Sequence, residues 1–337
     1  MKPVASIGYW AFNKGRILKA KYEHVFHSPE AVINATIQKA VGSSVVNKVQ
    51  IKKGESNQVF AVELANGQEV IVRTSRRNKS RFYTERWAIE QCAKAGIPVP
   101  HILFVETIEH EGKPLNILIE SKIQGTPLDE LAMGKLSDKE LAELLRKTGA
   151  VLSKIHSITT SGFGDLDEGG NGKYELIGEM FSEKGLFRDH LIKTARAVHL
   201  DPGIVLQALS LLHEYSIRYP TLSPCLIHND FTPRHVLVAG DNVSGILDFE
   251  LAQGGDPVRE FARWKYFFED RFASRYLMEG YENRAVFGED FEERINIWKL
   301  YTGLIHLDSF SYKRTALIPE WVERCKARLT EAVGYFR

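Results

Sequence analysis

The sequence predicts an α+β fold of two lobes, with antiparallel strands in the N-terminal lobe and mainly helices in the C-terminal lobe. Short β-rich runs separated by turns dominate residues 45–120, whereas apolar residues at helical spacing dominate the chain after Gly125 and Pro127. A length of 337 residues is sufficient for two modest lobes around a substantial core. We expect residues 1–123 to form the first lobe and residues 124–337 the second.

Composition argues against several kinds of partner. The formal net charge of +1 gives no overall attraction to nucleic acid or to an anionic membrane. The N-terminal residues 1–10 contain no long apolar core of the kind that marks a secretory signal, and no segment approaches the apolar length of a membrane span. The three cysteines, Cys92, Cys225 and Cys325, are scattered and lack metal-ligand spacing, which is typical of reduced packing residues. We therefore expect a cytoplasmic enzyme, monomeric or homodimeric, without nucleic-acid or membrane partners.

The first lobe is expected to begin with a helix and to continue as a sheet. Ser28, followed by Pro and Glu, is a helix-start pattern, and the helical spacing continues to about Ala40. Residues 45–73 then change to strand-like runs with an Asn-Gly turn at 66–67, which predicts antiparallel strands. Further strands are expected at residues 101–105 and 115–120.

Three features of this lobe have a structural and a functional interpretation. The turn from Gly54 to Asn57 is either a tight hairpin or a flexible lip whose backbone amides and Ser56 and Asn57 side chains cover nucleotide phosphates. Arg73 at a strand end is either solvated or a phosphate clamp. Glu85, in the first turns of a helix starting near Phe82, either pairs with Arg73 or is an exposed carboxylate favoured by the helix dipole. The basic run at 76–81 is interpreted as a solvated loop.

The second lobe is expected to be helical on both sides of one short β segment. Residues 136–156 show helical apolar spacing and open with a capping box at Ser137, and His156 on this helix is expected to be structural. The Gly-rich stretch at 161–172 follows no predicted strand and ends in no Lys-Ser/Thr pair, which excludes a dinucleotide or Walker site. One or two further helices are predicted for residues 173–220, and the chain after residues 252–262 is also predicted to be helical.

The most informative segment is residues 225–250. His228 and Asp230 follow an apolar run, His235 precedes a second, and a third leads to Asp248. Two β-rich runs around a Gly-Asp-Asn turn at 240–242 predict a hairpin that brings these side chains together. Such a group is typical of phosphoryl transfer, in which one carboxylate accepts the proton of an attacking hydroxyl. A second carboxylate and a neutral ligand then hold magnesium on the nucleotide phosphates.

Together these segments resemble the aminoglycoside phosphotransferase and choline kinase superfamily, whose members have a two-lobed protein-kinase-like fold. The resemblance covers nearly the whole chain after about Val45. Its specific part is the His-x-Asp of residues 228–230, the five-residue step to His235, and the Leu-Asp-Phe-Glu run that ends at Glu250.

The resemblance implies a role for each matching position. Asp230 would be the catalytic base and Asp248 the principal Mg²⁺ ligand, with His235 in the second-ligand position. Arg73 would contact the α and β phosphates of ATP or GTP and pair with Glu85. The remaining nucleotide contacts would come from the lip and the hinge backbone, namely Gly54, Ser56, Asn57, Ser121 and Ile123. Supporting roles would fall to His228, Asp256 and Glu260.

Two positions depart from the usual pattern of this superfamily. Arg73 stands where most members have Lys, and its guanidinium is bulkier although it makes bidentate phosphate contacts. His235 stands where Asn is usual, and imidazole nitrogen is a softer ligand that magnesium favours less. Macrolide phosphotransferases share the His and hygromycin B phosphotransferase shares the Arg, so neither departure argues strongly against activity.

The acceptor is the least determined feature. In this superfamily it lies between the catalytic loop and the C-terminal helices, so candidate contacts are Trp264, Phe268, Glu269, Asp270 and the acidic run 289–293. An acidic wall with aromatics would suit a cationic amino sugar, although a solvated helix face and core aromatics explain the same residues. The leading hypothesis is an ATP- or GTP-dependent small-molecule O-kinase of the aminoglycoside phosphotransferase type, whose acceptor is an aminoglycoside-like antibiotic, which would make antibiotic resistance its role, or a related sugar-like metabolite. A macrolide kinase, a housekeeping sugar, choline or homoserine kinase, and a nucleotide-binding pseudokinase scaffold remain alternatives.

Overall fold

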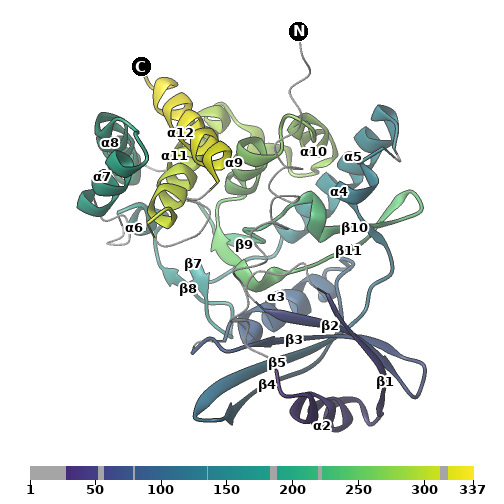
Figure 1. Ribbon diagram of the computed structural model, residues 1–337. Helices are drawn as coiled ribbons and strands as arrows, with labels where there is room; N and C mark the ends of the chain where they lie inside the picture. The colour runs from purple at the N-terminus through teal and green to yellow at the C-terminus, as the bar shows by residue number, and fades with distance from the viewer. Residues whose placement is uncertain are drawn as a thin grey trace.

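The computed structural model describes residues 28–51, 57–78, 80–134, 136–182, 188–218, 222–311 and 318–337. Figure 1 shows a strand-rich lobe, purple to blue, below a helical lobe that runs from teal to yellow. The α+β class predicted from the sequence is therefore confirmed. Residues 122–125 connect the last strand of the first lobe to the second lobe, and the expected division between residues 123 and 124 falls within this connection.

The first lobe is built on a five-stranded antiparallel sheet of order β1-β2-β3-β5-β4. Its strands are β1 (Val45–Ile51), β2 (Gln58–Leu64), β3 (Glu69–Ser75), β4 (Ile102–His110) and β5 (Lys113–Ser121). Strands were expected in all of these regions.

Two helices flank this sheet, α2 (Glu30–Val41) and α3 (Phe82–Lys94). Alternation along β3 directs Val70 and Val72 into an apolar cluster with α2, and directs Arg73 to the other face, where α3 carries Glu85. Ser28 does not cap α2 as expected; its hydroxyl instead bonds Gln58 and Thr74 of the sheet. The face of β3 that carries Arg73 is thus turned toward α3 and Glu85.

The connection between the lobes runs directly into the predicted hairpin. β6 (Thr126–Pro127) pairs with β10 (Val236–Ala239), which pairs with β11 (Asn242–Ile246). A second small sheet, of order β8-β7-β12-β9, contains β7 (Phe163–Leu166), β8 (Gly172–Tyr174), β9 (Cys225–Ile227) and β12 (Gln253–Gly255). β9 and β10 therefore fix both ends of the loop 228–235.

Helices make up the rest of the second lobe. The described helices are α4 (Leu128–Leu131), α5 (Asp138–Ile155), α6 (Ile177–Phe181), α7 (Arg188–Ala197), α8 (Pro202–Arg218), α9 (Val258–Phe267), α10 (Ser274–Gly280), α11 (Phe291–Ser309) and α12 (Pro319–Gly334). Three short 3-10 turns cover Pro233–His235, Phe249–Leu251 and Arg284–Phe287. The capping box at Ser137 is present, and His156 is buried against the hydroxyl of Tyr281, as a structural histidine should be.

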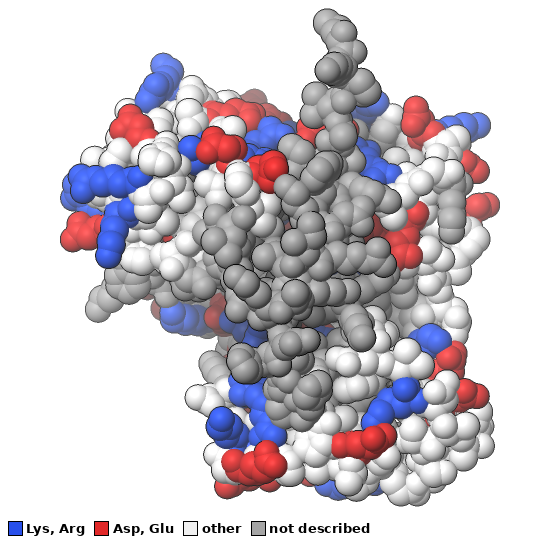
Figure 2. Space-filling view, viewed as in Figure 1, with Lys and Arg blue, Asp and Glu red and all other residues white. Residues whose placement is uncertain are grey.

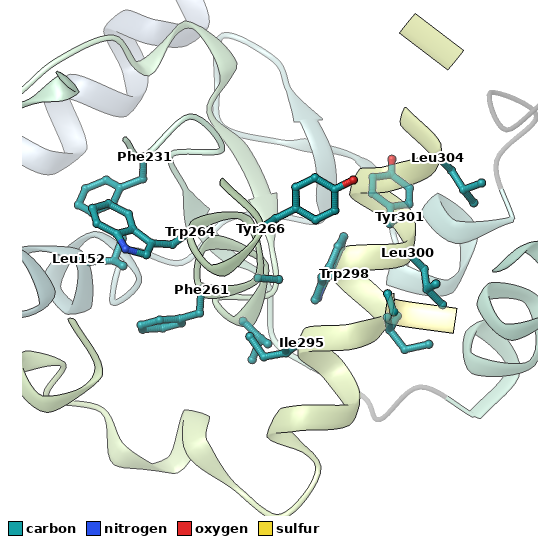
Figure 3. Packing of buried hydrophobic residues seen from close by; sticks show 14 of the residues in the cluster. Leu152, Phe231, Phe261, Trp264, Tyr266, Ile295, Trp298, Leu300, Tyr301 and Leu304 are labelled. Carbon is teal, nitrogen blue, oxygen red and sulfur yellow. The ribbon is translucent and has the colours of Figure 1, made fainter. Parts of the chain in front are cut away.

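The core of this lobe lies around α9 and α11. Figure 3 shows Trp264 of α9 beside Phe231 and Leu152, and Trp298 and Tyr301 of α11 side by side. Asp256, at the start of α9, is fully buried and accepts hydrogen bonds from Arg294 at 2.5 Å and from the indole of Trp298 at 2.9 Å. A polar buttress was expected at Asp256, and these contacts supply it.

In the part of the chain that the structure describes, no helix has the length and apolarity needed to cross a membrane. The cysteines Cys92, Cys225 and Cys325 are all unpaired and buried, in agreement with their expected role as packing residues.

Substituting Gly254 should destabilise the sheet that holds the loop 228–235. A Cβ at Gly254 would lie 2.0 Å from the carbonyl oxygen of Gly162, and backbone cannot move aside cheaply. We expect Gly254→Ala to lower the free energy of unfolding by about 2–3 kcal/mol, measured by urea denaturation. Gly288→Ala is the matched control, because its Cβ would meet no atom closer than 3.5 Å. Equal stability of the two variants would contradict this packing.

Candidate active site

The loop after β9 is held by backbone geometry that few residues tolerate. Asn229 has a φ of 62°, in the left-handed region that Asn accepts more readily than most residues. Its backbone N–H donates to the buried carboxylate of Glu260 at 2.9 Å, and its side-chain amide donates to the carbonyl of Leu251 at 3.1 Å. Glu260 thus supports the loop as expected, whereas the role of Asn229 was missed because a positive φ leaves only a weak sequence signal.

His228 connects this loop to the hairpin. It is completely buried, and burial lowers its pKa to about 4, so the ring is neutral. Nε2 lies 2.9 Å from the carbonyl oxygen of Leu247, and the backbone N–H of Asp230 points at Nδ1 from 3.3 Å. One ring nitrogen therefore donates and the other accepts, and His228 positions both Asp230 and the residue before Asp248.

Asp230, His235 and Asp248 come together as the sequence motif predicts. One ligand atom from each lies within 4.8 Å of the others. Nδ1 of His235 lies 3.0 Å from the carbonyl oxygen of Asp230, and Nε2 receives the Nε–H of Arg234 at 3.1 Å. Because the carbonyl can only accept and the guanidinium can only donate, the proton is on Nδ1 and the lone pair is on Nε2. That lone pair lies on the side of Asp248, 3.6 Å from its carboxylate.

Asp248 is the most strained member of the group. Its φ of 68° places a non-glycine residue in the left-handed region, which is typical of functional sites. Burial acts to raise the pKa of this carboxyl, but Arg73 at 3.1 Å and His235 outweigh it and hold the pKa below its ordinary value. The carboxylate is therefore charged and partly exposed, as a ligand for a cation must be.

Arg73 is the buried cation on which both lobes converge. Only 6% of the residue is exposed, and its guanidinium contacts Glu85 at 2.5 Å, Asp248 at 3.1 Å and Glu250 at 3.3 Å. The Arg73–Glu85 pair is therefore present, and the solvated interpretation of either residue is excluded. Burial raises the pKa of Glu85 while Arg73 opposes that shift.

Glu250 is the functional residue that the sequence analysis left without a role. One of its carboxylate oxygens binds Arg77, and the other accepts from Arg73 and, at 2.6 Å, from the side chain of Asn57. Arg77 belongs to the basic run interpreted as solvated; its side chain is 42% exposed, in agreement with that interpretation, but it also forms this ion pair. The sequence does place an acidic residue, Glu250, two positions after Asp248. Nothing in the sequence identifies the residues that Glu250 contacts.

The remaining nucleotide-site candidates are only partly positioned. Gly54 and Ser56 lie outside the described residues, whereas Asn57 reaches Glu250. The backbone of Ser121 was expected to bind a nucleotide base. Its N–H already donates to the carbonyl of His101, so this N–H is not available to a base. The side chain of Ile123 packs over Gly245 of the hairpin. Its backbone N–H donates no hydrogen bond to another described residue.

The four residues expected to line the acceptor site do not form one wall beside Asp230 in the structure. Trp264 is 1% exposed and donates its indole N–H to the carbonyl of Phe272, so assigning it to a substrate surface is wrong for this conformation. Phe268 packs on Trp264, and Glu269 accepts from the backbone N–H of Ser274. Asp270 is exposed beside a hollow of about 580 Å³ next to α12, where Arg324 and Arg328 pair with it.

The groups that flank Asp230 are basic instead. Arg263 of α9 lies 3.5 Å from the Asp230 carboxylate, and Arg234 lies 3.9 Å from it. Neither residue was singled out from the sequence, because α9 and the loop meet only in the folded chain.

A strand-rich lobe with a buried cation, next to a helical lobe whose loop and hairpin bring Asp230, His235 and Asp248 together, is the arrangement expected of a kinase-like phosphotransferase. A family model described as the phosphotransferase enzyme family matches residues 49–292. The chain belongs to this family and is a small-molecule phosphotransferase. No curated protein matches the sequence.

Solved structures agree in fold. A thermostable mutant of aminoglycoside phosphotransferase APH(4)-Ia superposes with a TM-score of 0.67 and 22% identity, over 90% of this chain and 98% of that chain. A putative fructosamine-3-kinase from Thermobifida fusca gives 0.60 and 19%, over 87% and 98%. APH(2'')-Ib with bound ADP gives 0.57 and 18%, over 90% and 99%.

Glu120 on β5 provides a test of the electrostatics around Arg73. Burial raises its pKa to about 7, although Arg73 acts in the opposite direction. Because the folded protein holds this proton more tightly than the unfolded chain, the stabilisation is complete below about pH 4.5 and is lost as pH rises through 7. We expect the free energy of unfolding to fall by roughly 2–3 kcal/mol from pH 5 to 8.5 through this group.

Urea denaturation at several pH values measures this fall, and Glu120→Gln should flatten it. Glu63→Gln, an exposed carboxylate on β2, is the matched control and should retain the wild-type slope. A slope in Glu120→Gln as steep as that of the wild type would contradict the assignment.

Proposed function

We propose that this protein transfers the γ-phosphate of ATP or GTP to a hydroxyl group of a small molecule. The observation that carries the proposal is the group of Asp230, His235 and Asp248 within 4.8 Å of one another, directly beside Arg73. A related structure was solved as a ternary complex with AMP-PNP and hygromycin B, which is consistent with a nucleotide and a hydroxyl-bearing acceptor here. We also propose a cytoplasmic location, where nucleotide is available and the three thiols stay reduced.

In this mechanism the Asp230 carboxylate accepts the proton of the acceptor hydroxyl. The oxygen of that hydroxyl attacks the γ-phosphorus at the same time. The bond from the γ-phosphorus to the β–γ bridging oxygen breaks, and the nucleoside diphosphate leaves. His228 and Asn229 hold Asp230 in position for this step, since they fix the backbone that leads into Asp230. Arg73 would bind the α and β phosphates through N–H groups that now contact Asp248 and Glu250.

The donor set fits a divalent cation held by Asp248 and Nε2 of His235. One carboxylate and one imidazole nitrogen suit Mg²⁺ less well than an all-oxygen ligand set, and suit Mn²⁺ better. Such an ion supplies charge neutralisation on the β and γ phosphates when it is bound. The Arg234 N–H that now occupies Nε2 must turn away before this nitrogen can act as a ligand.

Replacing Asp230 should separate catalysis from binding. We expect Asp230→Asn to lower kcat by about 10²- to 10⁴-fold while nucleotide affinity remains, because the side chain would act only as a base. Product formation is followed by phosphorus NMR, with aminoglycosides, macrolides, choline and sugars as acceptors, and affinity by calorimetry. Asp241→Asn, an exposed carboxylate at the hairpin turn, is the matched control.

Wild-type protein that binds nucleotide but neither modifies an acceptor nor hydrolyses nucleotide would contradict the proposal. In that case the pseudokinase scaffold would be the better interpretation.

The identity of the metal provides a second test. We expect the wild type to reach half-maximal activity at a several-fold lower concentration of Mn²⁺ than of Mg²⁺, and His235→Asn to reduce this difference, because an amide oxygen replaces a softer nitrogen. Metal titrations of nucleotide hydrolysis measure both values. An unchanged Mn²⁺ to Mg²⁺ ratio in His235→Asn would show that this ring is not a ligand. Asp248→Ala should remove metal-dependent nucleotide affinity altogether.

A further inference from the structure

The acceptor side of Asp230 carries three arginines that lack strong carboxylate partners. Arg263 makes one long contact of 3.5 Å to Asp230, and Arg234 lies 3.9 Å from the same carboxylate. Arg259 lies one helical turn before Arg263, so the two side chains share a face of α9. A guanidinium has five N–H donors, and these contacts use only a few of them.

Arg259 is the most unusual of the three. It is 7% exposed, lies 5.1 Å and 5.3 Å from the rings of Trp298 and Tyr301, and donates to Gln253 at 2.6 Å. Its Nε is buried without a hydrogen-bond partner, and no carboxylate of the described residues pairs with it. Burial lowers the pKa of Arg259, and the carboxylates of Glu260 and Asp165 only partly oppose this shift.

Buried arginines elsewhere in the chain are neutralised. Arg294 binds Asp256 through two nitrogens, at 2.5 Å and 3.3 Å, and Arg73 contacts three carboxylates. The nearest acids do not balance these cations, because Asp165 is also contacted by Arg81 and because burial raises the pKa of Glu260 to about 7. The surplus positive charge is therefore local to the face beside Asp230.

We propose that the acceptor is an anionic alcohol, a molecule that carries an oxyanion, carboxylate or phosphate, near the hydroxyl that is phosphorylated. This inference rests on the proposed function and names the substrate class of that same site. Arg263 binds the oxyanion with the donors that Asp230 does not use, Arg234 flanks it from the loop, and Arg259 adds positive potential from behind. A polycationic amino sugar would place its ammonium groups against these arginines, which costs free energy for like charges.

The test uses acceptors that differ mainly in charge. One set is glucuronate, glucose 6-phosphate, glucose and glucosamine, and a second is glycerate, glycerol 3-phosphate, glycerol and serinol. Phosphoryl transfer is measured by phosphorus NMR, and binding by calorimetry to the full chain loaded with metal and AMP-PNP. We expect the acidic members to exceed their neutral and cationic matches by at least about tenfold in kcat/KM or affinity. The carboxylate and phosphate arms identify which oxyanion is preferred.

Arg263→Gln should remove most of this advantage, by about 10- to 100-fold in the KM of the acidic acceptor, with the KM of the nucleotide unchanged. Arg263→Lys should restore part of it. Arg196→Gln, on the exposed face of α7, removes the same charge far from the site and should change nothing. Far-UV circular dichroism and urea denaturation check that each variant is folded.

Nucleotide hydrolysis distinguishes failure of this inference from failure of the proposed function. If hydrolysis is present and is lost in Asp230→Asn, the proposed function stands. In that case, a preference for cationic or neutral members, or no binding of any acidic member, overturns the inference. A higher nucleotide KM in Arg263→Gln with an unchanged acceptor preference also overturns it, because the guanidinium would then serve the γ-phosphate. If hydrolysis is absent in the wild type, the proposed function itself fails.

Discussion

Arg73 is a buried cation that one strand places between carboxylates from both lobes, and the geometry of the site depends on it. Its guanidinium contacts Glu85 of α3 within its own lobe and both Asp248 and Glu250 of the other. Removing one partner of such a buried pair typically costs 3–5 kcal/mol, because the remaining charge stays desolvated. Glu250 extends this network to Asn57 and Arg77, so the residues next to the lip and after β3 are tied to the hairpin.

The loop 228–235 depends on a different constraint, which is backbone strain held by buried polar partners. Asn229 and Asp248 both have positive φ, and each is fixed by neighbours that cannot easily move: Glu260 for the first, and the bond between His228 and the Leu247 carbonyl for the second. Strained conformations persist only where the surroundings over-determine them. Asp256, Arg294 and Trp298 supply part of those surroundings below α9.

The distribution of charge gives the two sides of Asp230 different characters. Toward the first lobe, carboxylates outnumber the cations and surround Arg73. Toward α9, arginines outnumber available carboxylates. On the face in Figure 2, acidic and basic side chains alternate over the described surface of both lobes, in keeping with a net charge of +1, so this asymmetry is a local property.

The sequence by itself determined the two-lobed α+β fold, the strands and the hairpin, and the set of Asp230, His235 and Asp248. These features follow from short-range periodicity, turn chemistry and a motif of fixed spacing. Only the tertiary structure decided that Trp264 faces the core and that the N–H of Ser121 donates to His101. It also decided that Arg77 and Asn57 contact Glu250 and that Arg263 lies beside Asp230. Each of these depends on which face of a helix or strand meets an element far away in the chain. Single-sequence patterns carry no record of such pairings, because a charged residue on one helix is compatible with many partners until packing selects one.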